Sequence, residues 1–259
     1  MNTITTEYTQ RMHPRQDSPV DVSSPVIWLR EGWNDFMATP MTSLLIGGAF
    51  TLLCLAAYGA ISISPMLSAT TVALMLLASP FIAAIAYSVA RQQQQTSTAS
   101  LRQAVYEMRT RALDIGLFSV FCALIVGAWV RLSSIVFAMF YGSLEVNTAA
   151  ELARAWTAGF EYPTMLLFML ITGAVLGLTI FAIGAIALPM IAEKDSDIIT
   201  AMGASIARLR EHSITMLVWV SFILGAVSLA LLSSLALMPV IFPVLAYASW
   251  HSYKHLSSR

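Results

Sequence analysis

The sequence predicts an all-α membrane protein: a polytopic bundle of six transmembrane helices, with three amphipathic helices at the cytoplasmic interface. Its 259 residues are 58% hydrophobic and only 11% charged, whereas soluble domains carry about 25% charged residues. The segment from Thr164 to Ile191 runs for 28 residues without an Asp, Glu, Lys or Arg. Because a bilayer core of about 30 Å needs roughly 20 apolar helical residues, this segment is long enough to span it. The chain contains several more such segments.

The composition also limits the partners and the chemistry. A formal net charge of zero argues against a nucleic-acid partner, which would call for an excess of positive charge. Cys54 and Cys122 both lie within apolar runs, which suits buried thiols better than a disulfide framework or a metal site. No signal-peptide pattern precedes the first apolar run, so that run is expected to remain in the membrane as a span.

The N-terminal part is predicted to be a tail followed by an interfacial helix. Residues 1–23 show no periodicity and should form a disordered cytoplasmic tail. A short helix should follow, with Ser24 as N-cap and Pro25 in its first turn. It should lie in the membrane interface, with Trp28 and Trp33 at the level of the lipid headgroups. Its expected apolar face comprises Val26, Leu29, Trp33 and Phe36.

The remaining chain is predicted to form one membrane domain over residues 24–254, with a short tail at 255–259. The six expected spans cover about residues 43–63, 69–89, 112–140, 164–191, 213–232 and 234–250. A second amphipathic helix should start at Ser100, with Gln103 completing a capping box. A surface helix should start at Thr148, and a third amphipathic helix should lie within 193–212, its apolar face being Ile198, Met202, Ile206 and Leu209. The order of interfacial helix, span and span then occurs three times, which suggests a threefold repeat.

The distribution of basic residues predicts the orientation. With six spans, both chain ends lie on one side of the membrane. Of the 14 Lys and Arg residues, 12 fall on that side, Arg154 falls on the other, and Arg131 lies within a span. Cytoplasmic loops carry the excess of Lys and Arg, so both termini are expected in the cytoplasm.

Arg131, in the sequence WVRL, is the basic residue within an apolar run. A charge inside the bilayer is costly, which makes such a residue a candidate for function. The alternative is structural: Arg131 lies near the outer end of its span and could extend to the headgroups beside Trp129. We favour the structural interpretation. Glu145, Glu151 and Glu161 are candidate partners in the outer loop.

Glycines and prolines within the spans predict close packing and kinks. Gly173 and Gly177 form a small-xxx-small pattern, which favours close helix approach within this chain or with a partner. A proline leaves the carbonyl one turn earlier without its helical donor, which gives either a packing kink or, less often, an ion-coordinating break. The second span of each repeat carries prolines in its later half: Pro80, Pro189, and Pro239 with Pro243.

Motifs for catalysis or cofactor binding are absent from the sequence. His251 and His255 are four residues apart, a spacing that could suit a metal, but no further ligand type lies near them. Such a pair near a helix C-terminus usually faces solvent and complements the helix dipole. No span carries a histidine at mid-depth for a haem, and there is no phosphate-binding glycine loop, HExxH, GxSxG or CxxC. The sequence therefore predicts no cofactor, no metal site and no enzyme.

Several short sequences together resemble a known family. They are WLREGWNDF at Trp28–Phe36, SPFIAAIAYSVAR at Ser79–Arg91, WVRL at Trp129–Leu132, LPM at Leu188–Met190 followed by Ala201 and Ser205, and WHSYK at Trp250–Lys254. In these the chain resembles a family of bacterial integral membrane proteins of unknown function, some of which are labelled cytochrome-oxidase-subunit-I-like. The resemblance implies a bacterial inner-membrane location. The family's last span often reads P-x-x-G-H-A-x-W-H-x-Y, but here only the second histidine is present, as His251, which argues against a histidine-pair role with haem or copper.

These observations favour a non-catalytic accessory or assembly subunit of a membrane complex, a respiratory complex being one candidate. Besides the lipid bilayer, a membrane-protein partner or a second copy of the chain is expected. The alternative is a small channel or transporter, favoured by the repeat, the proline-containing spans and Arg131. An enzyme that uses residues at the cytoplasmic rim ranks last.

Overall fold

The computed structural model describes residues 19–60, 63–96, 98–141, 163–193 and 196–257. Within these ranges every regular element is a helix, so the all-α prediction is confirmed. The helices are α2 (Ser24–Ala38), α3 (Pro40–Ala60), α4 (Pro65–Thr96), α5 (Leu101–Thr110), α6 (Ala112–Tyr141), α8 (Pro163–Gly184), α9 (Ala187–Glu193), α10 (Ile198–Glu211), α11 (Ser213–Leu232) and α12 (Met238–Ser257). The predicted N-terminal tail up to residue 18 and the surface helix at Thr148 lie outside the described residues.

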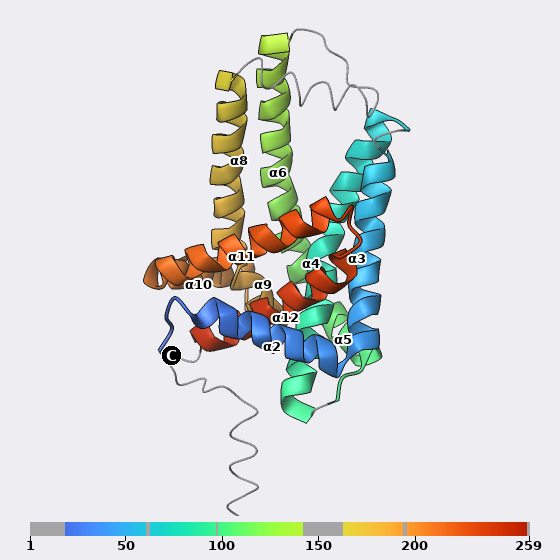
Figure 1. Ribbon diagram of the computed structural model, residues 1–259, viewed down its shortest axis with the longest axis vertical. Coiled ribbons are helices and arrows are strands. Elements are labelled where there is room, and N and C mark those ends of the chain that lie inside the picture. The colour runs from blue at the N-terminus through green and yellow to red at the C-terminus, as the bar shows by residue number, and fades with distance from the viewer. Residues whose placement is uncertain (1–18, 61–62, 97, 142–162, 194–195, 258–259) are drawn as a thin grey trace, which may run out of the picture.

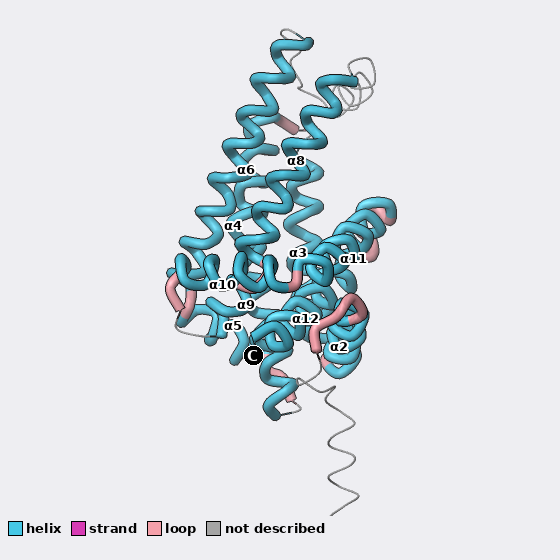
Figure 2. Tube along the Cα trace, turned by 90° about the vertical axis from the view of Figure 1, so that its left-hand side faces the viewer, coloured by secondary structure: helices cyan, strands magenta, loops and turns pink. Residues whose placement is uncertain are grey.

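The helices run in two directions. α3, α4, α6 and α8 extend along the long axis of the molecule, whereas α2 and α12 lie across it and α11 is inclined to it (Figures 1 and 2). α12 packs against α2, α3 and α4, and so joins the crossing helices to the long ones. The first two predicted units thus have spans along the axis and the third does not. The structure does not show three equivalent repeats.

Five described helical segments are long and apolar enough to cross a membrane: Pro40–Ala60, Thr70–Thr96, Ala112–Val136, Leu166–Glu193 and Ser213–Leu232. They correspond to the first five predicted spans. The sixth, expected over 234–250, is not among them. Residues before Met238 form a turn in which Ser234 and Leu235 adopt positive φ, and α12 extends to Ser257 through the polar residues that follow Trp250. Its boundaries therefore differ at both ends from the prediction.

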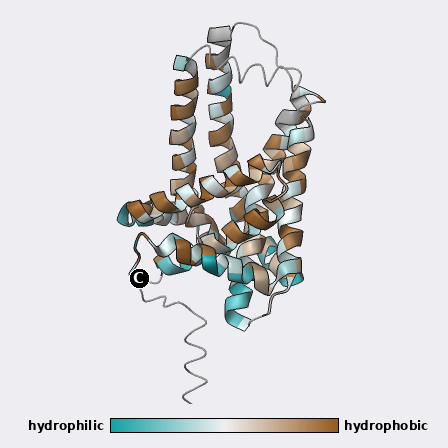
Figure 3. Ribbon diagram, viewed as in Figure 1, coloured by the Kyte–Doolittle hydropathy of each residue, from teal (hydrophilic) through white to brown (hydrophobic). Residues whose placement is uncertain are grey.

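The apolar surface of the protein matches a lipid environment. Figure 3 shows hydrophobic residues along most of α6 and α8, while hydrophilic residues gather on α2 and at the lower end of α4. Large side chains of α8, among them Leu167, Leu170 and Val175, are more than half exposed. In water such a surface would be a large association patch; in a bilayer it is the surface that lipid tails cover.

α2 is amphipathic, but only part of the predicted face is buried: Phe36 is buried and Leu29 packs against the core. Trp28, Gly32 and Phe36 are buried against the core, whereas Val26 and Trp33 are exposed. The buried face is therefore shifted by about a quarter of a turn from the predicted one, and Phe36 belongs to both. The helix start also differs: Ser24 is its first residue, and the Asp21 carboxylate accepts hydrogen bonds from the backbone N–H of Ser24 and of the preceding residue.

The two other amphipathic helices form where predicted. Ser100 precedes α5, but its backbone N–H donates to Gln92 Oε1 at 2.8 Å. Gln103 instead donates to Glu107, so the predicted capping box is wrong. α10 is capped by Asp197, whose carboxylate accepts from the backbone N–H of Thr200 at 3.0 Å. The side chain and the backbone N–H of Thr200 both lower the pKa of Asp197, as expected for a carboxylate that accepts hydrogen bonds at a helix N-terminus.

The fourth predicted span is interrupted between α8 and α9. Ser205 of α10 inserts into the helical hydrogen-bond ladder at this point. Its hydroxyl donates to the carbonyl of Ala182 at 2.7 Å and accepts from the N–H of Ile186 at 3.1 Å. These two backbone groups would pair with each other in a continuous helix, so one side chain replaces the missing bond.

Replacing Ser205 with alanine is expected to destabilise the protein by about 1–2 kcal/mol, because it leaves a buried backbone donor and acceptor without their partner. The change should appear as a lower thermal midpoint in detergent, followed by tryptophan fluorescence. Ser221→Ala is the control, because the exposed Ser221 hydroxyl donates only to a carbonyl of its own helix. Equal midpoints for the two variants would contradict the bridging role of Ser205.

α12 approaches its neighbours so closely that two glycines are required. A Cβ on Gly32 of α2 would lie 2.6 Å from the carbonyl oxygen of Val244 and 2.8 Å from the backbone nitrogen of Ala248. A Cβ on Gly47 of α3 would overlap the carbonyl oxygen of Pro239. That carbonyl has no helical donor, because the residue four positions later is Pro243. These glycines therefore allow the backbone of α12 to pack directly on α2 and α3.

Candidate functional site

The C-terminal half of α12 gathers polar side chains in the core. Residues 250–256 are described as part of α12 and are mostly buried. Five of their side chains make polar contacts with α2, α4 and α9, which are distant in sequence. We call these five residues the α12 cluster: Trp250, His251, Tyr253, Lys254 and His255.

The hydrogen bonds around His251 define its tautomer. The indole N–H of Trp250 can only donate, and it donates to Gln94 Oε1 at 3.1 Å. The Gln94 amide is thereby oriented with its Nε2 toward His251 Nδ1, 3.2 Å away. His251 therefore accepts at Nδ1 and carries its proton on Nε2, which donates to Asp35 Oδ2 at 2.8 Å. The neutral imidazole satisfies both neighbours at once.

A second group of contacts centres on Glu193, the last residue of α9. The hydroxyl of Tyr253 donates to Glu193 Oε2 at 2.6 Å, and the ammonium of Lys254 donates to Oε1 at 2.9 Å. Burial and the adjacent Glu193 carboxylate raise the pKa of Tyr253 above its ordinary value. Lys254 also lies 5.5 Å from the centre of the Trp250 ring, within range of a cation–π interaction. Glu193 thus ties the end of α9 to α12.

Trp28 is buried in the core and does not present its ring at the surface. It is 1% exposed, its ring meets Trp219 edge-on with centroids 5.7 Å apart, and its indole N–H donates to His255 Nδ1 at 3.2 Å. Trp33, the other predicted interfacial tryptophan, is 47% exposed and stacks on Phe36. Only Trp33 is therefore placed as an interfacial side chain would be.

A further set of predicted site residues, on α6 and α8, is distant in sequence from the α12 cluster. Trp129 donates to Thr172 of α8 at 3.3 Å, and a Cβ on Gly173 would lie 3.2 Å from the Trp129 ring. Gly173 therefore permits α6 and α8 to pack. A Cβ on Gly177 would meet nothing within 4 Å, so this glycine is not needed for packing within the described chain. Arg131 is exposed on α6.

The predicted prolines lie in the packed interior of the structure. Pro80, Pro189 and Pro243 are all buried. The carbonyl of Leu76, four residues before Pro80, accepts from the Ser79 hydroxyl at 3.2 Å. Pro189 lies one turn after the interruption that Ser205 bridges, and near Pro243 the unbonded carbonyl of Pro239 faces Gly47. At Pro80 a side chain thus bonds the open carbonyl, and at Pro243 a glycine of α3 packs against it.

His251 and His255 contact different partners, Asp35 with Gln94 and Trp28 respectively. Among the described residues no group of three or more His, Cys, Asp or Glu could hold a metal ion. Two buried polar atoms of this region, Gln92 Nε2 and Ser252 Oγ, lack a hydrogen-bond partner within the described chain. The chemistry that the cluster offers is therefore hydrogen bonding and ion pairing between helices.

Sequence reasoning selected His251 and Trp28 but missed Asp35, Gln94 and Glu193. In the sequence Asp35 belongs to the polar face of an amphipathic helix, and Gln94 belongs to a run of four glutamines. His251 is 216 residues from Asp35 and 157 from Gln94, so no local pattern connects them. The feature of the sequence that could have indicated this cluster is WHSYK, because it holds more polar residues than the end of a transmembrane span usually does.

Comparison with known proteins agrees with this membrane architecture. Residues 66–193, from α4 to the end of α9, match the model of a family described as "Predicted integral membrane protein (DUF2189)". No curated protein and no solved structure matches the chain. The family match covers three of the five candidate spans and ends at Glu193. The chain is an integral, multi-pass membrane protein, and over these residues it is similar to a family of predicted integral membrane proteins.

Proposed function

We propose that this protein is a non-catalytic accessory or assembly subunit of a membrane complex. The observation that supports this is the pairing within the α12 cluster. The imidazole of His251 is bonded on both ring nitrogens, and Glu193 accepts from two donors. Side chains that are used to hold α2, α4, α9 and α12 together leave few groups to act on a substrate, which favours a structural role for the cluster.

The test is purification of the intact chain from its native membrane in a mild detergent, followed by native mass measurement. An accessory role predicts a complex with a defined partner at fixed stoichiometry, and loss of that partner's activity when the chain is deleted. Respiratory complexes are the first to assay. A chain recovered only alone or as a homo-oligomer, with no effect of its deletion on membrane complexes, would contradict the proposal.

A small channel or transporter is the alternative, and the location of Arg131 favours it. This residue lies within the candidate span Ala112–Val136. Flux in proteoliposomes that Arg131→Ala abolishes and Ser134→Ala preserves would support transport, since Ser134 is an exposed neighbour on the same helix whose hydroxyl donates to its own backbone. Unchanged flux in Arg131→Ala would favour the structural interpretation, in which the Arg131 side chain extends to the lipid headgroups.

We further propose that both chain ends are cytoplasmic. Trp28 near the start of α2 contacts His255 near the end of α12, so the two ends meet on one side of the bundle (Figure 1). The turn before Met238 reverses the chain between α11 and α12, so α12 runs back toward the side where α11 begins, and we expect an even number of crossings. The excess of basic residues assigns that common side to the cytoplasm.

Reporter fusions provide the measurement for this topology. Alkaline phosphatase fused at either terminus should be inactive and green fluorescent protein should be fluorescent, because both ends remain in the cytoplasm. A phosphatase fusion after Tyr141, at the end of α6, should be active and serves as the positive control. Opposite results for the two termini would contradict the even number of crossings.

A further inference from the structure

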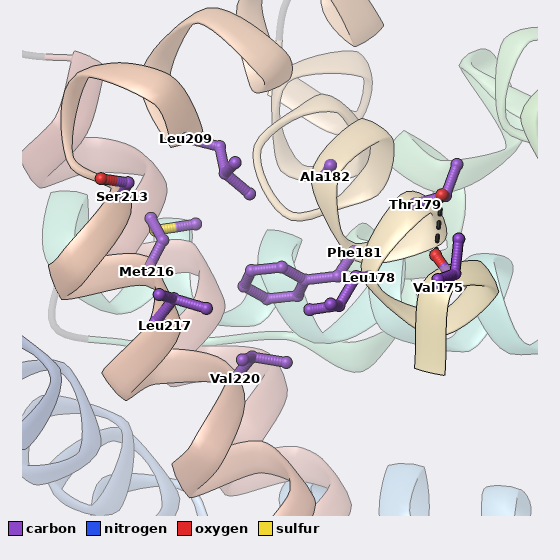
Figure 4. Close-up of a pocket in the computed structure, with 10 residues that line it drawn as sticks. All are labelled: Val175, Leu178, Thr179, Phe181, Ala182, Leu209, Ser213, Met216, Leu217 and Val220. Atoms are coloured by element: carbon purple, nitrogen blue, oxygen red, sulfur yellow. Dashed lines mark hydrogen bonds between the residues drawn. The ribbon is translucent and has the colours of Figure 1, made fainter. Parts of the chain in front are cut away.

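An apolar groove of about 470 Å³ lies between α8 and α11. Figure 4 shows Leu178 and Phe181 of α8 directed toward Met216, Leu217 and Val220 of α11. α11 packs against α2, α10 and α12, and it is inclined to α8 rather than lying along it (Figures 1 and 2). The two helices therefore diverge and leave a groove between them. Its volume is in the range of about 300–1,000 Å³ that is usual for small-molecule sites.

The lining of the groove selects an apolar occupant. Most of its side chains are aliphatic or aromatic. The hydroxyl of Thr179 already donates to the carbonyl of Val175 at 2.8 Å (Figure 4), so it does not require a partner in the groove. A polar solute would lose its hydration there without gaining hydrogen bonds. A hydrocarbon chain makes no hydrogen bonds with water, so it would lose none on entering the groove.

The groove opens toward surface that lipid covers. Leu178 and Leu217 line it and are 47% and 56% exposed. They belong to α8 and α11, both of which are apolar enough to lie in a membrane. Lipid tails are therefore the apolar molecules at highest concentration beside the groove, and one tail can enter it directly from the bilayer.

Two arginines adjoin, in the chain, the residues that line one end of the groove. Leu209 and Ser213 line this end and lie together in Figure 4. Between them in the chain is Arg210, which is exposed, and next to Leu209 is Arg208, whose guanidinium pairs with Glu211 at 2.8 Å. Guanidinium groups bind phosphate oxygens well, and basic residues beside membrane helices attract anionic lipids.

We propose that the groove binds one acyl chain of an anionic phospholipid, with the lipid phosphate beside Arg210 at the α10 end. This assignment goes beyond the accessory role proposed above and does not depend on it. α10 is an amphipathic helix that meets the apolar α11 at Ser213, which is where a headgroup and its chain would separate. The occupant is a bilayer lipid; a second copy of this protein is the competing occupant that the experiment must exclude.

The experiment is native mass spectrometry of the full chain in mild detergent, with phosphatidylglycerol or phosphatidylcholine of identical acyl chains. We expect one retained phosphatidylglycerol per monomer. Leu217→Trp, and separately Leu178→Trp, should fill the groove and lower retention about tenfold, which corresponds to about 1.4 kcal/mol. Leu224→Trp is the matched control, since it lies two turns further along α11, is 61% exposed, and does not line the groove.

The headgroup is tested by Arg210→Gln, which should make retention of the two lipids nearly equal. Melting midpoints of all variants establish that they fold, and having two groove-filling variants ensures a result if one does not. Wild-type retention in both Leu217→Trp and Leu178→Trp, or equal loss in Leu224→Trp, would overturn the site. A dimer that dissociates on groove filling would instead assign the groove to a second copy. An unchanged preference in Arg210→Gln would overturn the phosphate contact.

Discussion

Gly47→Ala is expected to lower the thermal midpoint of the protein by about 6–12 °C, which corresponds to roughly 3 kcal/mol for a chain of this size. The added methyl group would overlap the carbonyl oxygen of Pro239 and lie 2.6 Å from its carbonyl carbon. Both atoms are backbone, so no side chain can rotate away, and α12 must move from α3. Overpacking usually costs about 1–3 kcal/mol. Because this contact is rigid, we expect the cost of Gly47→Ala to lie at the upper end of that range.

Gly48→Ala is a closely matched control, because the two glycines are adjacent on α3 and a Cβ on Gly48 would meet nothing within 4 Å. Alanine has the higher helix propensity, so this variant should match or slightly exceed the wild-type midpoint. Both midpoints can be followed by tryptophan fluorescence in the same detergent. A similar fall in both variants would mean that the loss comes from the helix itself, and the close approach of α12 would be contradicted.

The movement of α12 would reach further than α3. The hydroxyls of Ser43 and Tyr247 are 2.8 Å apart and buried between these helices, and the rings of Phe50 and Phe242 stack with centroids 4.0 Å apart. Both contacts cross the same interface as Gly47. A displaced α12 would also shift the α12 cluster, which lies at its C-terminal half. One methyl group on α3 can therefore loosen the contacts of four helices.

Much of the fold follows from the sequence, because long apolar runs leave few alternatives. The membrane class and the approximate positions of five spans were predicted from run length and charge alone. The boundaries were less accurate where a helix end is polar. α4 continues through the glutamines to Thr96, since Gln92 accepts from the backbone N–H of Ser100 and Gln94 bonds Trp250 and His251 of α12. A polar run at the end of a span reads as a loop unless those distant partners are known.

The buried face of α2 was predicted only in part, for a different reason. Val26 and Trp33 lie on one apolar stripe, Trp28 lies on another, and Phe36 belongs to both. Helical periodicity identifies both stripes but does not say which one a neighbour covers. The choice is made by Gly32, which lies on the same face as Trp28 and lets the backbone of α12 approach. The glycine was visible in the sequence, but its partner was more than 200 residues away.

The sixth span shows the limit of hydropathy as a guide. Residues from Met238 to Ser249 are mostly apolar, and the prediction extended this run backward across the turn and stopped at Trp250. In the structure the polar residues beyond Trp250 are buried, because α2, α4 and α9 supply carboxylates and an amide for them. Several of the short sequences that carried the family resemblance, including WHSYK and Ser205, are the ones that make these interhelical contacts.

Asp35→Ala is expected to destabilise the protein by about 2–3 kcal/mol, because it removes the acceptor of the His251 Nε2 proton in a largely buried site. Asp35→Asn should cost less than half as much. Its amide oxygen can accept the same hydrogen bond, and the loss of the negative charge matters little if His251 is neutral. The hydrogen bonds from Trp250 through Gln94 require that neutral form. The ratio of the destabilisation by Asp35→Asn to that by Asp35→Ala therefore indicates whether the His251 imidazole is neutral or charged.

The measurement is the midpoint of thermal unfolding for Asp35→Ala, Asp35→Asn, His251→Phe and the two double variants. In a double-mutant cycle the coupling between Asp35 and His251 should be close to the cost of Asp35→Ala, because the Gln94 Nε2 donor that loses His251 is unpaired in both His251→Phe and the double variant and so cancels from the coupling. If Asp35→Asn is as damaging as Asp35→Ala, the stabilising contact is an ion pair with a protonated imidazole. In that case the Gln94 amide cannot be oriented as described, because Trp250 and a protonated Nδ1 would both need its oxygen.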